Sequence, residues 1–339
     1  YNTALGVETL YNSNSGSYNT AAGAYALRTN SSGSSNTSMG YAALYSNTTG
    51  GYNTAVGIQA LYSNTTASFN TAVGRQALRT NTTGSENTAI GSQALYSNTS
   101  GSYNTASGYQ ALYNNTTGYR NTSSGYQALY SNTTGSLNTA SGYQALFSNT
   151  TGSDNTAFGY VALWANTTGE SNTALGLFAL YSNTDGSYNT AIGRQALVTN
   201  TGGDYNNAYG YKALLNNTTG SFNNALGYGA LQTNTTGGSN VAIGTSALYS
   251  NSTGSGNVAI GYEAGWSETG SNKLYIANGS GSSSQLVYGD FSTGDLSLGQ
   301  TSGTVTVLND ADIDGTLTLG SMSNVESSIN TNTTNITNN

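Results

Sequence analysis

Residues 103–119 read YNTASGYQALYNNTTGY, and the next 17 residues repeat the pattern as RNTSSGYQALYSNTTGS. Sixteen tandem copies of this unit fill residues 1–271; the first fifteen, residues 1–255, are each 17 residues long without insertion or deletion. A period this short and strict is typical of a solenoid, in which each copy forms one rung and stacks on the next. At a strand spacing of ~4.8 Å per rung, the rod would be on the order of 75 Å long.

Repetition within the chain shows which positions the fold requires. We number the positions of the unit 1 to 17, starting at Tyr1; position 2 is Asn and position 6 is Gly in all sixteen copies. An unvarying Gly indicates a backbone torsion or a close approach that a Cβ would forbid. A repeated Asn can satisfy backbone groups at a corner and form a ladder along the axis. The expected structural ladders include Asn2, Asn19, Asn36, Asn87, Asn257, Gly6, Gly91 and Gly261.

The rest of the unit predicts how one rung is built. Position 10 is Leu in fifteen copies, and position 9 is Ala in every copy but the first. We interpret each rung as strand, Gly corner, second strand and Thr/Gly turn, which makes a thin two-strand parallel β-roll. A three-sided helix would need a six-residue sub-period, which the unit does not contain. Because a thin roll buries little apolar surface, we expect chains to associate along their length, with Leu and Tyr between them.

Composition limits the possible functions. Only 6% of the 339 residues are charged, and there is no Cys, His or Pro, so thiolate chemistry and the most common general base are absent. The net charge of −7 argues against a nucleic-acid partner, which requires a basic face. No segment approaches the ~20 apolar residues of a membrane span, so we expect no direct membrane insertion. Tyr1 is in phase with the repeat, so we expect this sequence to be a piece of a longer chain.

Several copies carry an Asn-x-Ala-Ile-Gly core, among them residues 87–91, 240–244 and 257–261. This core resembles the head repeats of trimeric autotransporter adhesins. The resemblance implies three chains side by side as left-handed parallel β-rolls, on an extracellular cell surface. The 17-residue unit is longer than is usual in that family.

The C-terminal residues strengthen this resemblance. Ile329 and Ile336 are seven residues apart, as successive a positions of a heptad would be, which places Asn332 and Asn339 at d. The pattern resembles the stalks of these adhesins, where three inward Asn side chains hold an anion such as chloride on the trimer axis. The alternative is that these Asn residues only set the register of the coil. Both interpretations imply a homotrimer, and no other cofactor or metal is expected.

Between repeat and coil, residues 270–278 and 286–291 resemble the segment that follows such repeats in bacterial surface fibres and in phage tail fibres. Many of those fibres end in a self-cleaving chaperone domain, which this sequence does not include. Alternation between residues 304 and 319 predicts a short β-rich neck. We therefore expect a sixteen-repeat solenoid at residues 1–271, a neck at 272–322 and the start of a trimeric coiled-coil stalk at 323–339.

Candidate catalytic and metal sites are few. Glu170, Asp185 and Asp204 occupy positions 17, 15 and 17 of successive rungs, and Glu170 and Asp204 would lie ~9.6 Å apart, within reach of an inverting glycosidase pair. We favour solvated turn residues instead, because no cleft or pKa-raising environment is evident. Residues 310–315 match the opening of a calcium loop, but Ser321 stands where its bidentate Glu belongs.

Aromatic residues recur at positions 7 and 11 and predict Tyr ladders along the rod. Such a ladder could bind a host glycan or receptor, or pack between chains. The candidate binding stripe is Tyr109, Tyr126, Tyr143 and Tyr160. The triplets at residues 47–49 and 251–253 match the glycosylation acceptor pattern, although turn chemistry explains them equally.

Taken together, these observations predict an extracellular trimeric fibre with a structural and adhesive role and no enzymatic activity. A bacterial surface adhesin or filament is the favoured interpretation. The alternative is a phage tail fibre with a receptor-binding role on the virion, and a less favoured one is a polysaccharide depolymerase.

Overall fold

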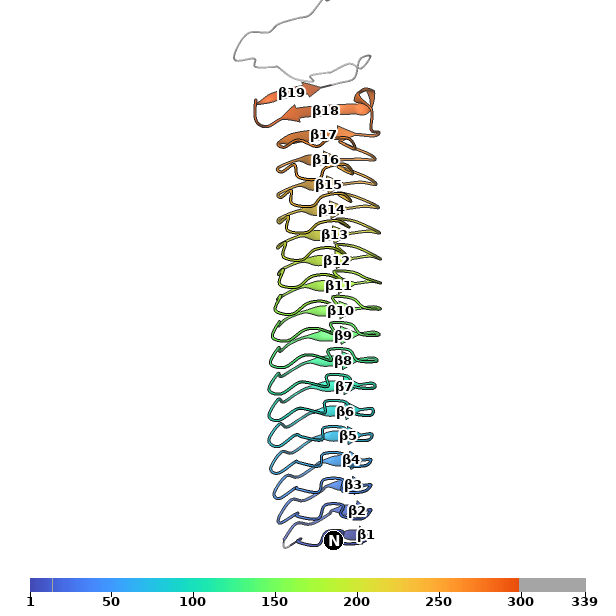
Figure 1. Cartoon of the computed structure of the whole chain (residues 1–339), viewed down its shortest axis with the longest axis vertical. Coiled ribbons are helices and arrows are strands. Elements are labelled where there is room, and N and C mark those ends of the chain that lie inside the picture. The colour runs from blue at the N-terminus through green and yellow to red at the C-terminus, as the bar shows by residue number, and fades with distance from the viewer. Residues whose placement is uncertain (14, 299–339) are drawn as a thin grey trace, which may run out of the picture. The chain divides into compact units, whose positions relative to one another are not determined.

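The computed structural model describes residues 1–13 and 15–298. The segment 310–315 that matches the opening of a calcium loop, the expected coiled-coil stalk with Asn332 and Asn339, and residues 299–322 of the expected neck lie outside these residues. Within them the chain forms one long stack of strands joined by turns (Figure 1). The strands of the repeats are β1 (Thr3–Leu5), β2 (Thr20–Ala22), β3 (Thr37–Met39), β4 (Thr54–Val56), β5 (Thr71–Val73), β6 (Thr88–Ile90), β7 (Thr105–Ser107), β8 (Thr122–Ser124), β9 (Thr139–Ser141), β10 (Thr156–Phe158), β11 (Thr173–Leu175), β12 (Thr190–Ile192), β13 (Asn207–Tyr209), β14 (Asn224–Leu226), β15 (Val241–Ile243) and β16 (Val258–Ile260).

The sixteen strands form one parallel, in-register sheet. Each strand occupies positions 3 to 5 of its rung and pairs with the strands before and after it in sequence, as in Thr105↔Thr122 and Ala106↔Ser123. The prediction of a parallel β-solenoid with 17-residue rungs is thereby confirmed. The chain is a β-solenoid repeat protein.

The second strand expected in each rung does not form. After the corner at position 6, the chain follows a run of turns in which positions 8 and 10 take left-handed torsions, such as φ 52° at Gln110 and φ 55° at Leu112. The reason lies in the burial pattern. Ala111 and Leu112 are adjacent and both fully buried, whereas neighbours in a strand point to opposite faces.

Left-handed torsions cost non-Gly residues of order 1 kcal/mol each, so something must offset this strain. Backbone hydrogen bonds between rungs continue through the segment. The backbone N–H of Leu112 donates to Ala128 O at 2.9 Å, and the backbone N–H of Gln110 donates to Ser92 O at 3.0 Å. Burying each Leu side chain adds roughly 1.5–3 kcal/mol. Repeated across the rungs, these gains hold the unusual backbone in place.

The apolar core lies inside the single chain. Ala at positions 4 and 9 and Leu at position 10 form three buried columns, represented in one rung by Ala106, Ala111 and Leu112. The expectation that Leu packs between chains is wrong, because in rungs 2 to 15 this side chain is fully enclosed by its own solenoid.

Two positions leave little room for a side chain: position 6 is always Gly, and position 16 is Gly in every rung but one, which has Ala67. At position 6, Gly108 has φ +135°, and a Cβ would lie 2.3 Å from the carbonyl oxygen of Gly125 in the next rung. At position 16, a Cβ on Gly118 would lie 2.4 Å from both Asn115 Oδ1 and the carbonyl oxygen of Gly135. Both contacts are to fixed groups, so these positions set how closely the rungs stack.

Two buried columns of Asn meet at the position-16 carbonyl. In one rung, Asn104 Nδ2 and Asn115 Nδ2 each donate to Gly118 O at 2.9 Å, using both of its lone pairs. Asn104 Oδ1 accepts the backbone N–H of Asn121 in the next rung at 3.0 Å. Asn115 Nδ2 also donates to Asn98 Oδ1 in the preceding rung at 2.8 Å. Buried amides so fully paired stabilise the rung and define its register.

The solenoid ends in a small antiparallel extension. Strand β17 (Lys273–Ala277) pairs parallel with β16, and β18 (Gln285–Asp290) and β19 (Asp295–Leu298) then pair antiparallel after the short 3-10 helix η1 (Ser282–Ser284). Gly265 stands at position 10, where the other copies have Leu, and the Tyr275 ring and the Leu248 side chain both lie close to the place that a Cβ would occupy there. Tyr275 therefore replaces the missing Leu and closes the core.

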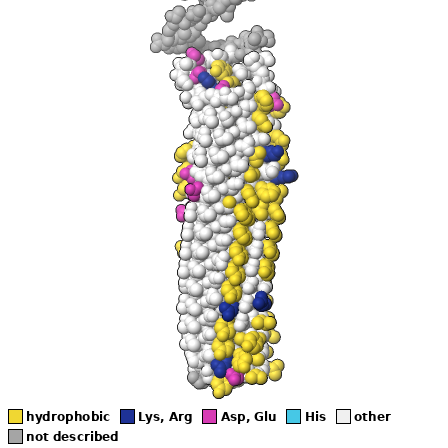
Figure 2. All heavy atoms as spheres, in the orientation of Figure 1, with side chains coloured by type: hydrophobic (Ala, Val, Ile, Leu, Met, Phe, Trp, Pro, Cys, Tyr) yellow, Lys and Arg dark blue, Asp and Glu magenta, His cyan; other side chains and the backbone are white. Residues whose placement is uncertain are grey.

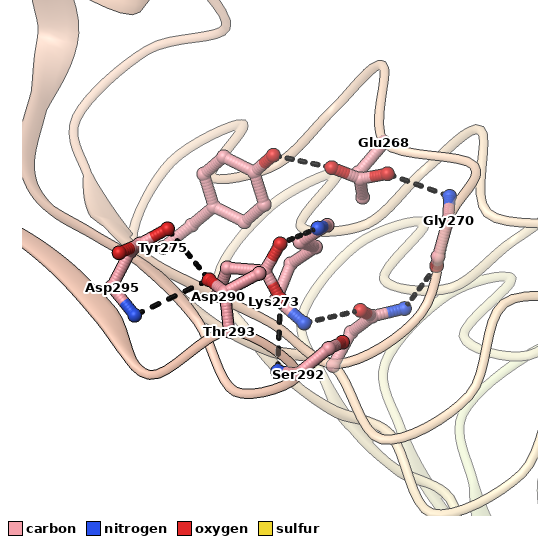
Figure 3. A network of polar contacts seen from close by, with 9 residues as sticks. Glu268, Gly270, Lys273, Tyr275, Asp290, Ser292, Thr293 and Asp295 are labelled. Carbon is pink, nitrogen blue, oxygen red and sulfur yellow. Dashed lines mark hydrogen bonds and ion pairs between the residues drawn. The ribbon is translucent and has the colours of Figure 1, made fainter.

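Polar groups around β17 and β18 tie this end together (Figure 3). The Tyr275 hydroxyl donates to Glu268, and Lys273 pairs with Asp290. Lys273 lowers the pKa of Asp290 to about 2, with help from the backbone N–H of Ser292. Burial, followed by the hydrogen bond to Glu268, raises the pKa of Tyr275 well above its usual range.

Candidate functional site

The most continuous surface feature is a column of stacked planar side chains at position 11. From Tyr96 the rings of successive rungs stack with centroids 5.0–5.7 Å apart and interplanar angles of 13° or less. This part of the ladder is Tyr96, Tyr113, Tyr130, Phe147, Trp164 and Tyr181. Hydrophobic side chains accordingly form long columns along the solenoid (Figure 2).

Two arginines extend the ladder toward the N-terminus. The Arg79 guanidinium lies 5.5 Å from the Tyr62 ring centroid and 5.7 Å from that of Tyr96. Arg28 lies in the same way between Tyr11 and Tyr45, at 5.5 and 5.6 Å. A guanidinium is planar and stacks on aromatic faces, so the ladder continues where the ring is missing. Their shared position 11 was the signal that the sequence interpretation overlooked.

The predicted binding stripe at position 7 forms a second ladder. Tyr109, Tyr126, Tyr143 and Tyr160 stack at 5.3, 5.2 and 5.1 Å, and their side chains remain 43–51% exposed. Phe178 at position 8 contacts Tyr160 and Tyr181 edge-on at 6.0 and 5.5 Å, and so bridges the two ladders at one end.

Position 8, which falls between positions 7 and 11 of the repeat, carries a row of glutamine side chains. In the middle of the row, Gln127 Nε2 donates to Gln110 Oε1 at 2.8 Å, and Gln144 Nε2 donates to Gln127 Oε1 at 2.9 Å. The bonded row is Gln59, Gln76, Gln93, Gln110, Gln127 and Gln144. The sequence interpretation missed this row, although six consecutive rungs with Gln at one position were a readable signal.

Stacking changes what the tyrosines can offer a ligand. Because each ring covers the face of the next, the outward surface presents ring edges and phenolic hydroxyls instead of flat apolar faces. Burial, with smaller effects from neighbouring tyrosines, raises the pKa of Tyr113. The Tyr113 phenol therefore stays neutral near pH 7.

The candidate carboxylates occupy the turn edge. Asp204 accepts the backbone N–H of Ser187 at 2.7 Å through Oδ1. At the same position in another pair of rungs, Ser102 Oγ accepts the N–H of Ser85 at 3.1 Å. Asp204 thus takes over a hydrogen bond that serine makes elsewhere in the column. Asp185 accepts a bond from its neighbour Thr184 at 3.1 Å, and Glu170 is exposed.

Two further sequence signals can be placed. Asn47 of the glycosylation-like triplet is fully buried, and its Nδ2 donates to Asn30 Oδ1 at 2.8 Å and to Gly50 O at 2.9 Å, so the folded solenoid does not offer it for modification. Residues 1–13 and 15–298 contain no cluster of three acidic, His or Cys ligands for a metal, and no helix in them could span a membrane.

The outward side of the sheet is the third surface. Positions 3 and 5 point away from the core, and none of the sixteen copies carries a charged residue at either position. Position 3 is Thr in twelve copies, and position 5 is mostly aliphatic or aromatic. Exposed side chains at position 5 range from 36% for Val73 to 73% for Leu5. A shallow apolar hollow of about 360 Å³ lies on this side beside Tyr209, Leu226 and Ile243.

No protein-family model, curated protein or solved structure matches this chain. Its class, a β-solenoid repeat protein, therefore rests on the sequence and the geometry described above.

Proposed function

We propose that this chain is the shaft of an extracellular homotrimeric fibre with a structural and adhesive role and no enzymatic activity. The observation that carries the proposal is the uncharged outward side of the sheet, which we name the sheet face (positions 3 and 5 of all rungs). Isolated exposed apolar residues are ordinary, but the apolar side chains at position 5 form two long columns, on either side of Ser107, Ser124 and Ser141, and such columns indicate an interaction surface.

A second copy of the chain fits this face. Copies share one rung spacing and one register, so side chains of neighbouring chains can meet rung by rung. The face measures about 75 Å by about 10 Å, or roughly 750 Å² per chain, close to the ~800 Å² per partner of a stable interface. The adhesin-like repeats and the expected stalk favour three chains over two.

Adhesion and location follow from the same resemblance and from the chemistry of the rod. A stack of similar rungs supplies length and repeated surface, which a fibre needs, and the carboxylates of the turn edge line neither of the hollows at Tyr209 and at Tyr41. A phage tail fibre with the same shaft is the alternative within this class.

The test is the mass of the particle in solution, measured by native mass spectrometry. We expect three chains, and a monomer or dimer would refute the trimer. The double variant Ile90→Lys/Phe158→Lys places charges on the sheet face and should dissociate the particle. The matched control, Ser100→Lys/Thr168→Lys, places the same charges on exposed turns of the same rungs and should leave the mass unchanged.

A further inference from the structure

We propose that the surface formed by positions 7, 8 and 11 between Gln93 and Tyr181, named here the aromatic–amide face, binds a neutral, extended polysaccharide lying parallel to the rod. The inference rests on the proposed adhesive function and supplies its ligand class. It is carried by the juxtaposition of two aromatic ladders with a bonded row of glutamines.

The three columns adjoin one another. Nearer the N-terminus, side chains at positions 7, 8 and 11 together line a shallow hollow of about 450 Å³, which includes Tyr41, Tyr45 and Gln59. Arg79 Nε at position 11 donates to Gln59 Oε1 at position 8 at 3.3 Å. At the other end, Phe178 contacts Tyr160 of one ladder and Tyr181 of the other. At Gln110, Gln127 and Gln144 the amide row is therefore flanked by aromatic residues at both position 7 and position 11.

The amides have unused hydrogen-bonding capacity. An amide side chain has two N–H donors and an oxygen with two lone pairs. In the row, Gln127 uses one donor toward Gln110 and one lone pair toward Gln144, so one donor and one lone pair remain. Its neighbours in the row repeat this arrangement at every rung, and their side chains are partly buried. A ligand that presents hydroxyl groups at regular intervals, each both donor and acceptor, matches this row.

The charge pattern selects a neutral ligand. Positions 7, 8 and 11 carry no charged residue in the rungs between Arg79 and Arg194. An anionic polymer would find no cation there, and a peptide strand would find no sheet edge, since the backbone groups of the rungs are paired along the axis. One sugar of an extended chain is about as long as one rung, so successive hydroxyls and ring edges can meet successive amides and phenols.

The mode of binding gives a signature. Since the ring faces are occupied by stacking, each sugar gains only hydrogen bonds and edge contacts, which are individually weak. Affinity should therefore rise with every sugar added until the ligand spans the face. A site that binds one terminal sugar would show no such dependence on length.

The experiment uses the full chain and β-1,4-linked glucose oligomers of two to six sugars as probes, with titration calorimetry as the readout. We expect affinity to increase steadily with length, and coiled α-1,4-linked glucose oligomers of equal length to bind more weakly. Losing one neutral hydrogen bond corresponds to about a fivefold loss of affinity, so Gln110→Leu/Gln127→Leu should weaken binding by about 25-fold. The matched control is Thr116→Ala/Thr133→Ala, on the turns of the same rungs.

The outcomes separate this inference from the proposed function. A trimer that shows no length-dependent binding overturns the inference and leaves the fibre intact. A monomer that binds the longer oligomers with the expected loss in the Gln variant supports the inference and refutes the trimer. If the Gln variant, folded by circular dichroism, instead loses its oligomeric mass, the face is a contact between chains and the inference is overturned.

Discussion

Replacing Asn104 by Ala tests whether the buried Asn columns hold the rungs together. The substitution removes the donor to Gly118 O and the acceptor for the Asn121 backbone N–H. Gly118 O keeps its bond from Asn115. The main cost is therefore that the backbone N–H of Asn121, a buried residue, loses its acceptor. An unsatisfied buried donor costs about 1–3 kcal/mol, and the lost bond to Gly118 about 1 kcal/mol. We therefore expect a destabilisation of about 2–4 kcal/mol.

Because each rung interacts mainly with its neighbours, the loss should be local. Hydrogen exchange should show faster exchange of the Asn121 amide and of its neighbours in the adjoining rungs, while amides several rungs away are unchanged. Urea unfolding followed by circular dichroism supplies the overall change in stability. The control is Thr117→Ala, on the exposed turn of the same rung, for which we expect a change within about 0.5 kcal/mol. Equal effects of the two substitutions would refute a structural role for the ladder.

Three further substitutions probe other features. Gly108→Ala should prevent proper stacking of its rung, because its Cβ would lie 2.3 Å from Gly125 O; native-like exchange protection in that rung would contradict this. Ala67→Gly should raise thermal stability, since Ala67 is a non-Gly residue at a position where the other rungs leave no room for a Cβ; a lower melting temperature would be inconsistent with that crowding. Asp290 has its pKa lowered to about 2, chiefly by Lys273, so its stabilising contribution is present above the unfolded pKa of about 3.9 and is lost as pH falls through about 2. Exchange protection of β17 and β18 should fall between pH 4 and pH 2 in the wild type and stay flat in Asp290→Asn; identical profiles would exclude this ion pair as the cause.

The period of the sequence was enough to predict the solenoid, because a fixed 17-residue spacing leaves each rung only its neighbours to pack against. The Gly corner at position 6 and the Asn column at position 2 could also be predicted, because every rung has Gly at the one position and Asn at the other, as Gly108 and Asn104 show. The second strand was predicted wrongly because Ala111 and Leu112 were assigned to a strand by their small and aliphatic character. Their adjacent burial requires left-handed turns instead, which composition alone does not reveal.

The candidate surfaces were predicted less completely. The Tyr109–Tyr160 column was found from its spacing, but the occupation of ring faces by stacking depends on side-chain direction, which the sequence does not specify. The Gln110 row was missed because glutamine at a surface position usually indicates only solvation, and its rung-to-rung bonds appear only in three dimensions. Asp204 was a candidate carboxylate from sequence, and its turn hydrogen bond supplies a structural reason for it.

The direction of the Asn bonds gives the rod a polarity that bears on its synthesis. In each rung the position-2 Oδ1 accepts from the backbone of the rung that follows, as Asn104 does from Asn121, and Asn98 Oδ1 likewise accepts from Asn115. A completed rung therefore presents fixed acceptors to the segment that is synthesised after it. We expect each rung to order on its predecessor, and a lost or gained repeat changes the length of the shaft without altering the surface that the next rung meets.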